Sequence, residues 1–148
     1  MTAEVQKVVC YVTHGHHLLV FTHDTVPIEV AGVQVPAGTI AANESPEHAA
    51  VRELCEETGR RGRIVRKLGV ARYDLRPARD EIAVRHFFHV TLPSGDPRER
   101  WRAGEPDVPT GHEPISWTCW WLPLTDAHVL AAGLGALIGQ LSAGLGDG

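Results

Sequence analysis

The sequence has little cysteine and no pattern that would pair it. Cys10, Cys55 and Cys119 form no Cys-x-x-Cys pair, and one thiol is left over under any pairing. Disulfides are rare in reducing compartments, where such thiols usually pack in the interior. We therefore expect reduced cysteines in a cytoplasmic protein rather than a disulfide framework.

The sequence also lacks a long hydrophobic run and a leader. No stretch approaches the roughly 18 uninterrupted apolar residues that a membrane-spanning helix needs. The N-terminus "MTAEVQKVVCYV" has acidic and polar residues before a short apolar run and has no small-residue cleavage site. We expect neither a membrane span nor a signal peptide, and we expect a cytoplasmic location.

A positive charge excess is absent as well. The formal net charge is −4, which argues against a general nucleic-acid binder, because such proteins carry a basic surface. The 148 residues are 43% hydrophobic and 22% charged, as in ordinary soluble proteins. This length is enough for one domain with its own core, so residues 1–148 are predicted to form a single domain.

What the sequence does contain is a series of β-type segments around one strong helix signal. The segments with strand character are residues 7–12, 18–22, 28–38, 63–75, 81–92 and 115–122. The first two form a predicted hairpin, and residues 76–80 form a predicted turn. Residues 93–114, rich in Pro, Gly and charge, are predicted to be a long surface loop, and residues 125–145 a C-terminal helix. This order indicates an α/β (α+β) fold with a mixed sheet.

The helix signal begins at Ser45-Pro46-Glu47. Serine suits an N-cap, proline suits the first helical position, and an early acid complements the helix dipole. Gly59 is the predicted left-handed residue at the C-terminal end. A helix from Ser45 to about Thr58 is therefore expected.

Three acids cluster on this helix. Glu53, Glu56 and Glu57 follow the i, i+3, i+4 spacing and share a face about 100° wide. The opposite side, which we expect to face the core, carries Val51, Leu54, Cys55 and Thr58. One interpretation is a solvated acidic face. The other is a site for a hard cation such as Mg²⁺ or Mn²⁺, which would turn the repulsion among the carboxylates into attraction and would suit phosphoryl chemistry.

The spacing around these acids resembles the signature of the Nudix hydrolases, G-x5-E-x7-R-E-U-x-E-E-x-G-U, where U is apolar. The matching residues are Gly38, Glu44, Arg52, Glu53, Leu54, Glu56, Glu57 and Gly59. Eight of nine specified positions agree over 23 residues, and the exception is Arg60 at the last apolar position. The resemblance implies an α/β/α sandwich with a mixed central sheet.

The resemblance also implies an activity, the hydrolysis of a nucleoside diphosphate linked to another moiety, with Mg²⁺ (or Mn²⁺). By match to the motif, the metal ligands would be Glu53, Glu56, Glu57 and the backbone carbonyl of Ala37. Arg52 and Glu44, the other catalytic-motif residues, would pair with each other and hold the preceding loop against the helix. The group that takes the proton of water would be a motif glutamate or an acid of the long loop; the candidates there are Glu105, Asp107 and Glu113.

One turn departs from the pattern common in the family, because Asn43 stands where glycine is frequent. Asparagine tolerates the left-handed conformation better than most residues, so we expect Asn43 to adopt it.

Residues outside the motif would choose the substrate. The stretch "VPAG" at residues 35–38 resembles ADP-ribose and nucleoside-diphosphate-sugar hydrolases, and Pro77 and Glu81 lie near positions that those enzymes keep. The candidate phosphate-binding residues are Arg72, Arg76 and Arg79. The aromatic residues that could stack on a base are Tyr73, Phe87, Trp101 and Trp117.

Two alternatives stay open at this point. The chain could be a nucleoside triphosphate or dinucleoside polyphosphate pyrophosphohydrolase, or a non-catalytic nucleotide-sensing module of the same fold. In each case the expected partner is a small nucleotide, not a nucleic acid or a membrane, and the resemblance allows a homodimer.

Overall fold

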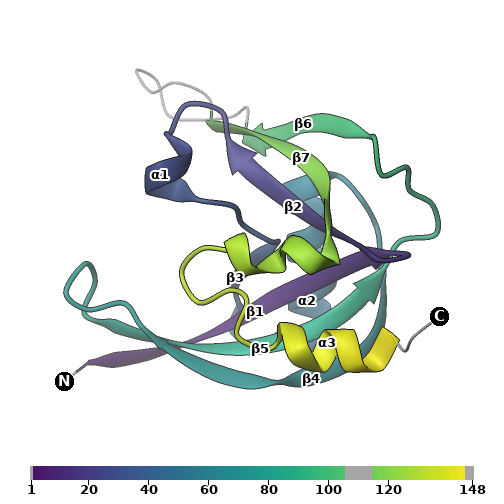
Figure 1. The fold of residues 1–148 in the computed structure, drawn as a ribbon. Coiled ribbons are helices and arrows are strands. Elements are labelled where there is room, and N and C mark those ends of the chain that lie inside the picture. The colour runs from purple at the N-terminus through teal and green to yellow at the C-terminus, as the bar shows by residue number, and fades with distance from the viewer. Residues whose placement is uncertain (1, 106–114, 146–148) are drawn as a thin grey trace.

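A computed structural model describes residues 2–105 and 115–145, which are built around one sheet (Figure 1). The strands are β1 (Ala3–His14), β2 (His17–His23), β3 (Ala37–Thr39), β4 (Arg63–Asp74), β5 (Glu81–Thr91), β6 (Arg100–Glu105) and β7 (Ile115–Pro123). The helices are α1 (Ile28–Ala31), α2 (Pro46–Thr58), the 3-10 helix η1 (Leu124–Val129) and α3 (Ile138–Leu145).

The sheet is mixed, as predicted. Its order is β4-β5-β1-β2-β7-β6, with β3 paired to β1 beside this path. β1 and β5 run parallel, while the other pairs are antiparallel. The middle of β1, at residues 7–9, therefore lies between β3 and β5, and the C-terminal end of β1 forms the predicted hairpin with β2.

Helices cover both faces of this sheet, which confirms the α/β/α arrangement. In Figure 1, α2 passes behind the sheet, whereas η1 and α3 lie in front. The alternation of β1 serves both sides: Val8 and Cys10 pack with α2, and Val9 and Tyr11 pack with η1 and α3. All three cysteines are free, and two of them are buried, as expected of thiols that pack in the core.

The prediction of one strand over residues 28–38 is wrong for its first part. Residues Ile28–Ala31 form the short helix α1, preceded by Pro27 and ended by Gly32, whose φ of 71° favours glycine. Its apolar side chains do not pack inward, since Ile28 and Val30 are exposed. A strand resumes only with β3.

The prediction of one loop over residues 93–114 is also wrong in part. β6 lies inside this range and pairs with β7 along its whole length. Trp101 and Ala103 alternate inward and pack against the core on the α2 side, which explains why a charged, glycine-containing segment forms a strand. Residues 106–114 lie outside the described part of the chain.

The predicted C-terminal helix is interrupted. Between η1 and α3 the backbone turns at Ala132 and Gly133, whose φ values of 52° and 73° are left-handed and incompatible with a continuing α-helix. Within residues 2–105 and 115–145, no helix is long and apolar enough to cross a bilayer.

The predicted ends of α2 are confirmed. The Ser45 side chain accepts a hydrogen bond from the His48 N–H at 3.1 Å, and Pro46 is the first helical residue. Gly59 ends the helix with φ 74°, and Asn43 has φ 64° in the turn before it. These local devices set where α2 starts and therefore where its acids lie.

Candidate active site

The acidic face of α2 does not point away from the core, so the predicted orientation of the helix is partly wrong. Glu53 and Glu57 are half-buried, and only Glu56 is exposed. The buried residues of the helix are Ala49, Ala50, Leu54 and Thr58. Val51 and Cys55, which were expected in the core, are only half-buried. The two alanines have small side chains, so this side of α2 can approach the sheet closely.

Glu53 lies directly over Gly38 of β3. A Cβ atom placed on Gly38 would lie 2.1 to 2.4 Å from three atoms of the Glu53 carboxyl group. The absence of a side chain at Gly38 therefore creates the space that this carboxylate occupies. Burial raises the pKa of Glu53, which is the response of an acid taken partly out of water.

Glu57 is joined to the neighbouring residue of the same strand. The Ala37 N–H donates to Glu57 Oε1 at 2.7 Å. The two residues that the motif comparison marks as ligands, Ala37 and Glu57, are therefore adjacent in space although they lie on different elements.

Arg52 organises the rest of the acidic cluster. Its guanidinium donates two hydrogen bonds to Glu44, at 2.8 and 2.9 Å, so the predicted pair is present. It also donates to Glu53 at 2.9 Å, to Glu56 at 3.2 Å and to the Thr39 carbonyl at 3.1 Å. The hydrogen bonds from Arg52 hold the pKa of Glu44 well below its usual range. This one cation offsets the like-charge repulsion along the helix.

In the part of the chain that the structure describes, no three metal-binding side chains converge as a finished ligand set. The contacts of Arg52 explain this, because Glu53 and Glu56 direct oxygen atoms toward its guanidinium. The donor types nevertheless fit a hard divalent cation, which prefers carboxylate and carbonyl oxygens. The space over Gly38 is shaped to admit such oxygens, so the residues present fit the metal that the motif implies.

Two indoles hold the C-terminal end of the helix. Trp117 Nε1–H donates to the Glu57 carbonyl at 2.6 Å, and Trp101 Nε1–H donates to the Thr58 carbonyl at 2.8 Å. The last carbonyls of a helix have no partner within it, so these bonds satisfy them and set the position of α2. Arg60 stacks over the Trp101 ring at 4.1 Å. Trp101 therefore serves the helix end rather than an open base-stacking surface.

A cavity of about 240 Å³ lies beside α2, and Glu57 is the one acid among its described lining residues. Glu57, Ala37 and Gly38 belong to its lining, and Lys7, Gln34 and Arg85 contribute the other polar side chains. The remaining lining residues are small or aliphatic: Val8, Val9, Ala31, Val35, Ala131, Ala132 and Leu134. The cavity thus combines an acidic group with two cations.

Arg85 is a site residue that reasoning from the sequence missed. It lies on β5, an interior strand of the sheet, and the residue is 9% exposed. It donates to the Ala132 carbonyl at 2.6 Å and lies 4.5 Å from the centre of the Tyr73 ring. The signal available in "EIAVRHFFHV" was a single arginine at a position that strand alternation directs to the same side as Ala83 and Phe87.

The three arginines that the sequence predicted as phosphate-binding lie elsewhere, on the exposed β4–β5 hairpin, and none of them lines the cavity. Each lies next to an acid: Arg72 is 2.7 Å from Glu4, Arg76 is 2.7 Å from Asp74, and Arg79 is 3.9 Å from Glu81. We therefore leave these three arginines and Trp101 out of the proposed substrate site.

The predicted general-base candidates of the long loop fall outside what the structure describes. Asp107 and Glu113 belong to residues 106–114, and the side chain of Glu105 is likewise not described.

Comparison with known proteins agrees with the motif and the fold. The sequence model of the NUDIX domain matches residues 4–139. The chain therefore belongs to the Nudix family. It is an enzyme of that family, a Nudix pyrophosphohydrolase.

Solved structures of similar shape support the same fold. A MutT NUDIX hydrolase from Burkholderia pseudomallei has a TM-score of 0.69 and 22% identity over 93% of this chain and 98% of that chain. A NUDIX hydrolase from Nitrosomonas europaea has a TM-score of 0.67 and 18% identity, covering 95% and 89%. A UDP-X diphosphatase has a TM-score of 0.63 and 14% identity, covering 97% and 65%. At these identities the likeness establishes the fold and does not select a substrate.

Proposed function

We propose that this enzyme cleaves the pyrophosphate linkage of a nucleoside diphosphate derivative of the ADP-ribose or nucleotide-sugar type, with Mg²⁺ or Mn²⁺. The observation that carries the proposal is that residues of the metal-binding motif and of the "VPAG" segment line one cavity. Glu57 reaches it from α2, while Val35, Ala37 and Gly38 reach it from the segment that leads into β3. The feature that resembles ADP-ribose and nucleotide-sugar hydrolases is thus part of the site itself.

Each motif residue has a role that its contacts support. Glu53, Glu56, Glu57 and the Ala37 carbonyl would hold the cation. When bound, the cation neutralises diphosphate oxygens and lowers the pKa of a water molecule. Arg52 orients Glu53 and Glu56 by hydrogen bonds, and Glu44 in turn fixes Arg52 from the loop before the helix. Losing Glu44 should therefore misplace ligands without removing one.

The charged side chains that line the cavity, one acid and two cations, favour a diphosphate over a neutral ligand. The Glu57 carboxylate and a phosphate group are both negative and repel each other, so a cation must lie between them if the phosphate binds there. Lys7 and Arg85 line the same cavity and provide positive charge that a second phosphate would meet. A diphosphate carries the two charged groups that this arrangement requires.

The test is product analysis on a substrate panel. Purified enzyme with Mg²⁺ or Mn²⁺ is incubated with ADP-ribose, nucleotide sugars, deoxynucleoside triphosphates and dinucleoside polyphosphates, and the products are separated by chromatography. We expect a nucleoside monophosphate plus a sugar phosphate from the first two groups. Preference for triphosphates or dinucleoside polyphosphates by kcat/KM would contradict the proposed substrate class. Glu47→Gln, which alters an exposed acid on the same helix, is the matched control for Glu57→Gln.

A further inference from the structure

The cavity contains two cations, Lys7 and Arg85, and only one of them has a described carboxylate within ion-pair distance. Lys7 of β1 and Arg85 of β5 are direct partners in the parallel pairing of these strands. Partners in register extend from the same side of a sheet, where like charges destabilise each other. Lys7 Nζ lies 3.6 Å from Glu81, which offsets its charge. No carboxylate of residues 2–105 or 115–145 whose side chain is described comes within 4.0 Å of the Arg85 guanidinium.

Arg85 is held in place without being neutralised. The Ala132 carbonyl accepts one of its hydrogen bonds, and the Tyr73 ring lies against its plane. Both partners are uncharged. Burial lowers the pKa of Arg85, yet a guanidinium stays protonated at neutral pH. A charged group that is partly buried without an anion is costly unless it meets one during function.

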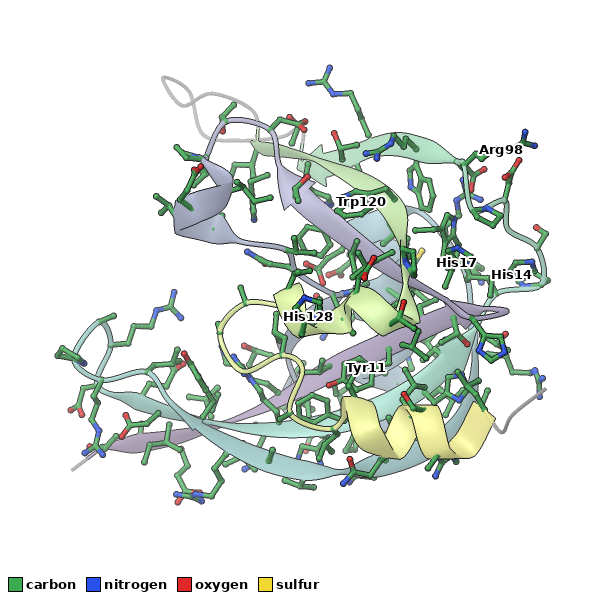
Figure 2. The ribbon with its side chains drawn as sticks, in the orientation of Figure 1. Tyr11, His14, His17, Arg98, Trp120 and His128 are labelled. Atoms are coloured by element: carbon green, nitrogen blue, oxygen red, sulfur yellow. The ribbon has the colours of Figure 1, made fainter. Side chains whose placement is uncertain are left out.

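The segment behind Arg85 is itself fixed by the core. Tyr11 projects from β1 toward the stretch before α3 (Figure 2). Its hydroxyl donates to the Leu134 carbonyl and accepts from the Leu137 N–H at 3.3 Å. Ala132 is held with a left-handed φ of 52°, uncommon for a residue with a side chain, and its carbonyl is the one that Arg85 contacts. The wall that orients the guanidinium is therefore preorganised.

We propose that Arg85 binds a phosphoryl group of the substrate in the cavity that Glu57 also lines, and that it is a determinant of substrate affinity. The planar fork of N–H donors suits two oxygens of one phosphate. The other donors of Arg85 have no partner in the described part of the chain, and the side chain lines the cavity. The identification of the anion as part of a diphosphate substrate rests on the proposed function. The anion site itself does not.

Among the described lining residues there is no aromatic side chain, so the cavity is not built to stack a base. The nucleobase would therefore lie outside the cavity, and the phosphate and the small group attached to it would lie inside. This assignment makes Arg85 indifferent to the identity of the base.

The test separates anion binding from catalysis. Thermal unfolding is measured in EDTA with and without inorganic pyrophosphate. At about ten times its dissociation constant, pyrophosphate should raise the Tm of the wild type by roughly 3–6 °C. Arg85→Gln should lose most of that shift, and Arg85→Lys should keep part of it. Arg98→Gln is the control, because Arg98 is exposed on the connection between β5 and β6, at the right-hand edge of Figure 2.

Steady-state kinetics provide the second readout. Arg85→Gln should lower kcat/KM by about 10- to 100-fold, mainly through KM, as expected for one charge-assisted contact present before and during the reaction. The loss should be similar for adenine and uracil nucleotides. Because Arg85→Gln could unfold, Arg85→Lys is measured in parallel, and an unchanged pyrophosphate shift in a folded Arg85 variant overturns the proposal.

The outcome also distinguishes this inference from the proposed function. If no substrate of the panel is cleaved but pyrophosphate binds through Arg85 in EDTA, the anion site stands and the substrate class fails. If Glu57→Gln abolishes the shift in EDTA as completely as Arg85→Gln, the shift does not report an anion at Arg85 and the inference fails. A wild type that pyrophosphate does not stabilise also contradicts it.

Discussion

The carboxylate of Glu57 and the backbone N–H of Ala37 are joined by a hydrogen bond of 2.7 Å. This contact ties the acidic helix to β3 at the edge of the cavity. It brings together a side chain and a backbone segment that lie 20 residues apart in the chain. The proposed metal site is therefore a junction of two elements and not a property of the helix alone.

Glu57→Gln should lower turnover by more than about 100-fold. Mutating a residue that only hydrogen-bonds to a metal ligand already costs about 10- to 100-fold in activity or metal affinity, and Glu57 is proposed to be a ligand itself. The glutamine oxygen can still accept the Ala37 N–H, so the fold should persist. The Tm in EDTA should be unchanged or slightly higher, since one like charge is removed from the helix. Turnover equal to that of wild type, measured with saturating Mg²⁺, would contradict the metal assignment.

Gly38→Ala should reduce activity far more than stability. The new methyl group would collide with the Glu53 carboxyl, which lies 2.1 to 2.4 Å from its position, and the flexible end of Glu53 would have to move. A displaced ligand should cost on the order of 100-fold in kcat/KM. Gly139→Ala is the matched control, because nothing lies within 4 Å of its added methyl group. Equal activity of the two variants would argue that Glu53 is not a ligand.

Glu44→Gln should lower the apparent affinity of the enzyme for Mg²⁺ without abolishing Mg²⁺-dependent activity. The change breaks the charged pair that holds Arg52, which then orients Glu53 and Glu56 less well. We expect the Mg²⁺ concentration for half-maximal rate to rise about 10- to 100-fold and the Tm to fall. Glu29→Gln on the exposed helix α1 is the control. A rate that no Mg²⁺ concentration restores would show that Glu44 does more than position Arg52.

Stability should fall as the pH is lowered from 7.5 to 5.5, in part through His89. Burial lowers the pKa of this histidine, and its ring lies 2.7 Å from the Thr13 hydroxyl. The unfolded chain therefore binds more protons than the folded protein below about pH 6.5, so stability is complete above that pH and is lost as the pH falls toward the folded pKa.

Thermal melts at both pH values check this prediction. His89→Gln should have a smaller difference in Tm between pH 7.5 and 5.5 than the wild type. His128→Gln, which changes an exposed histidine, should keep the wild-type difference. An unaltered difference in the His89 variant would show that this ring does not carry the pH dependence.

The elements that local patterns specify were the ones that the sequence predicted well. Ser45, Pro46 and Gly59 are local signals, and α2 begins and ends where they indicate. The β1–β2 hairpin and the β4–β5 pair likewise follow from runs of strand-forming residues. The sequence could place Glu53, Glu56 and Glu57 near one another because all three lie on this one helix.

The features that the sequence did not predict depend on contacts between residues that lie far apart in the chain. β6 forms because it pairs with β7, and the composition of residues 93–105 does not indicate that pairing. The side of α2 that faces inward depends on how closely Ala49 and Ala50 approach the sheet. Arg85 was not predicted as a site residue because its place at the cavity depends on Ala132, which lies 47 residues away along the chain.

The central claim is that the acids of α2 bind a divalent cation that drives cleavage of a pyrophosphate linkage. It is tested most directly by titrating metal-stripped enzyme with Mg²⁺ while the release of AMP from ADP-ribose is measured. We predict no release in EDTA and a saturable rise with Mg²⁺ that Glu57→Gln abolishes. Release of AMP in EDTA at the full rate, or a Mg²⁺ dependence that Glu57→Gln leaves intact, would contradict it.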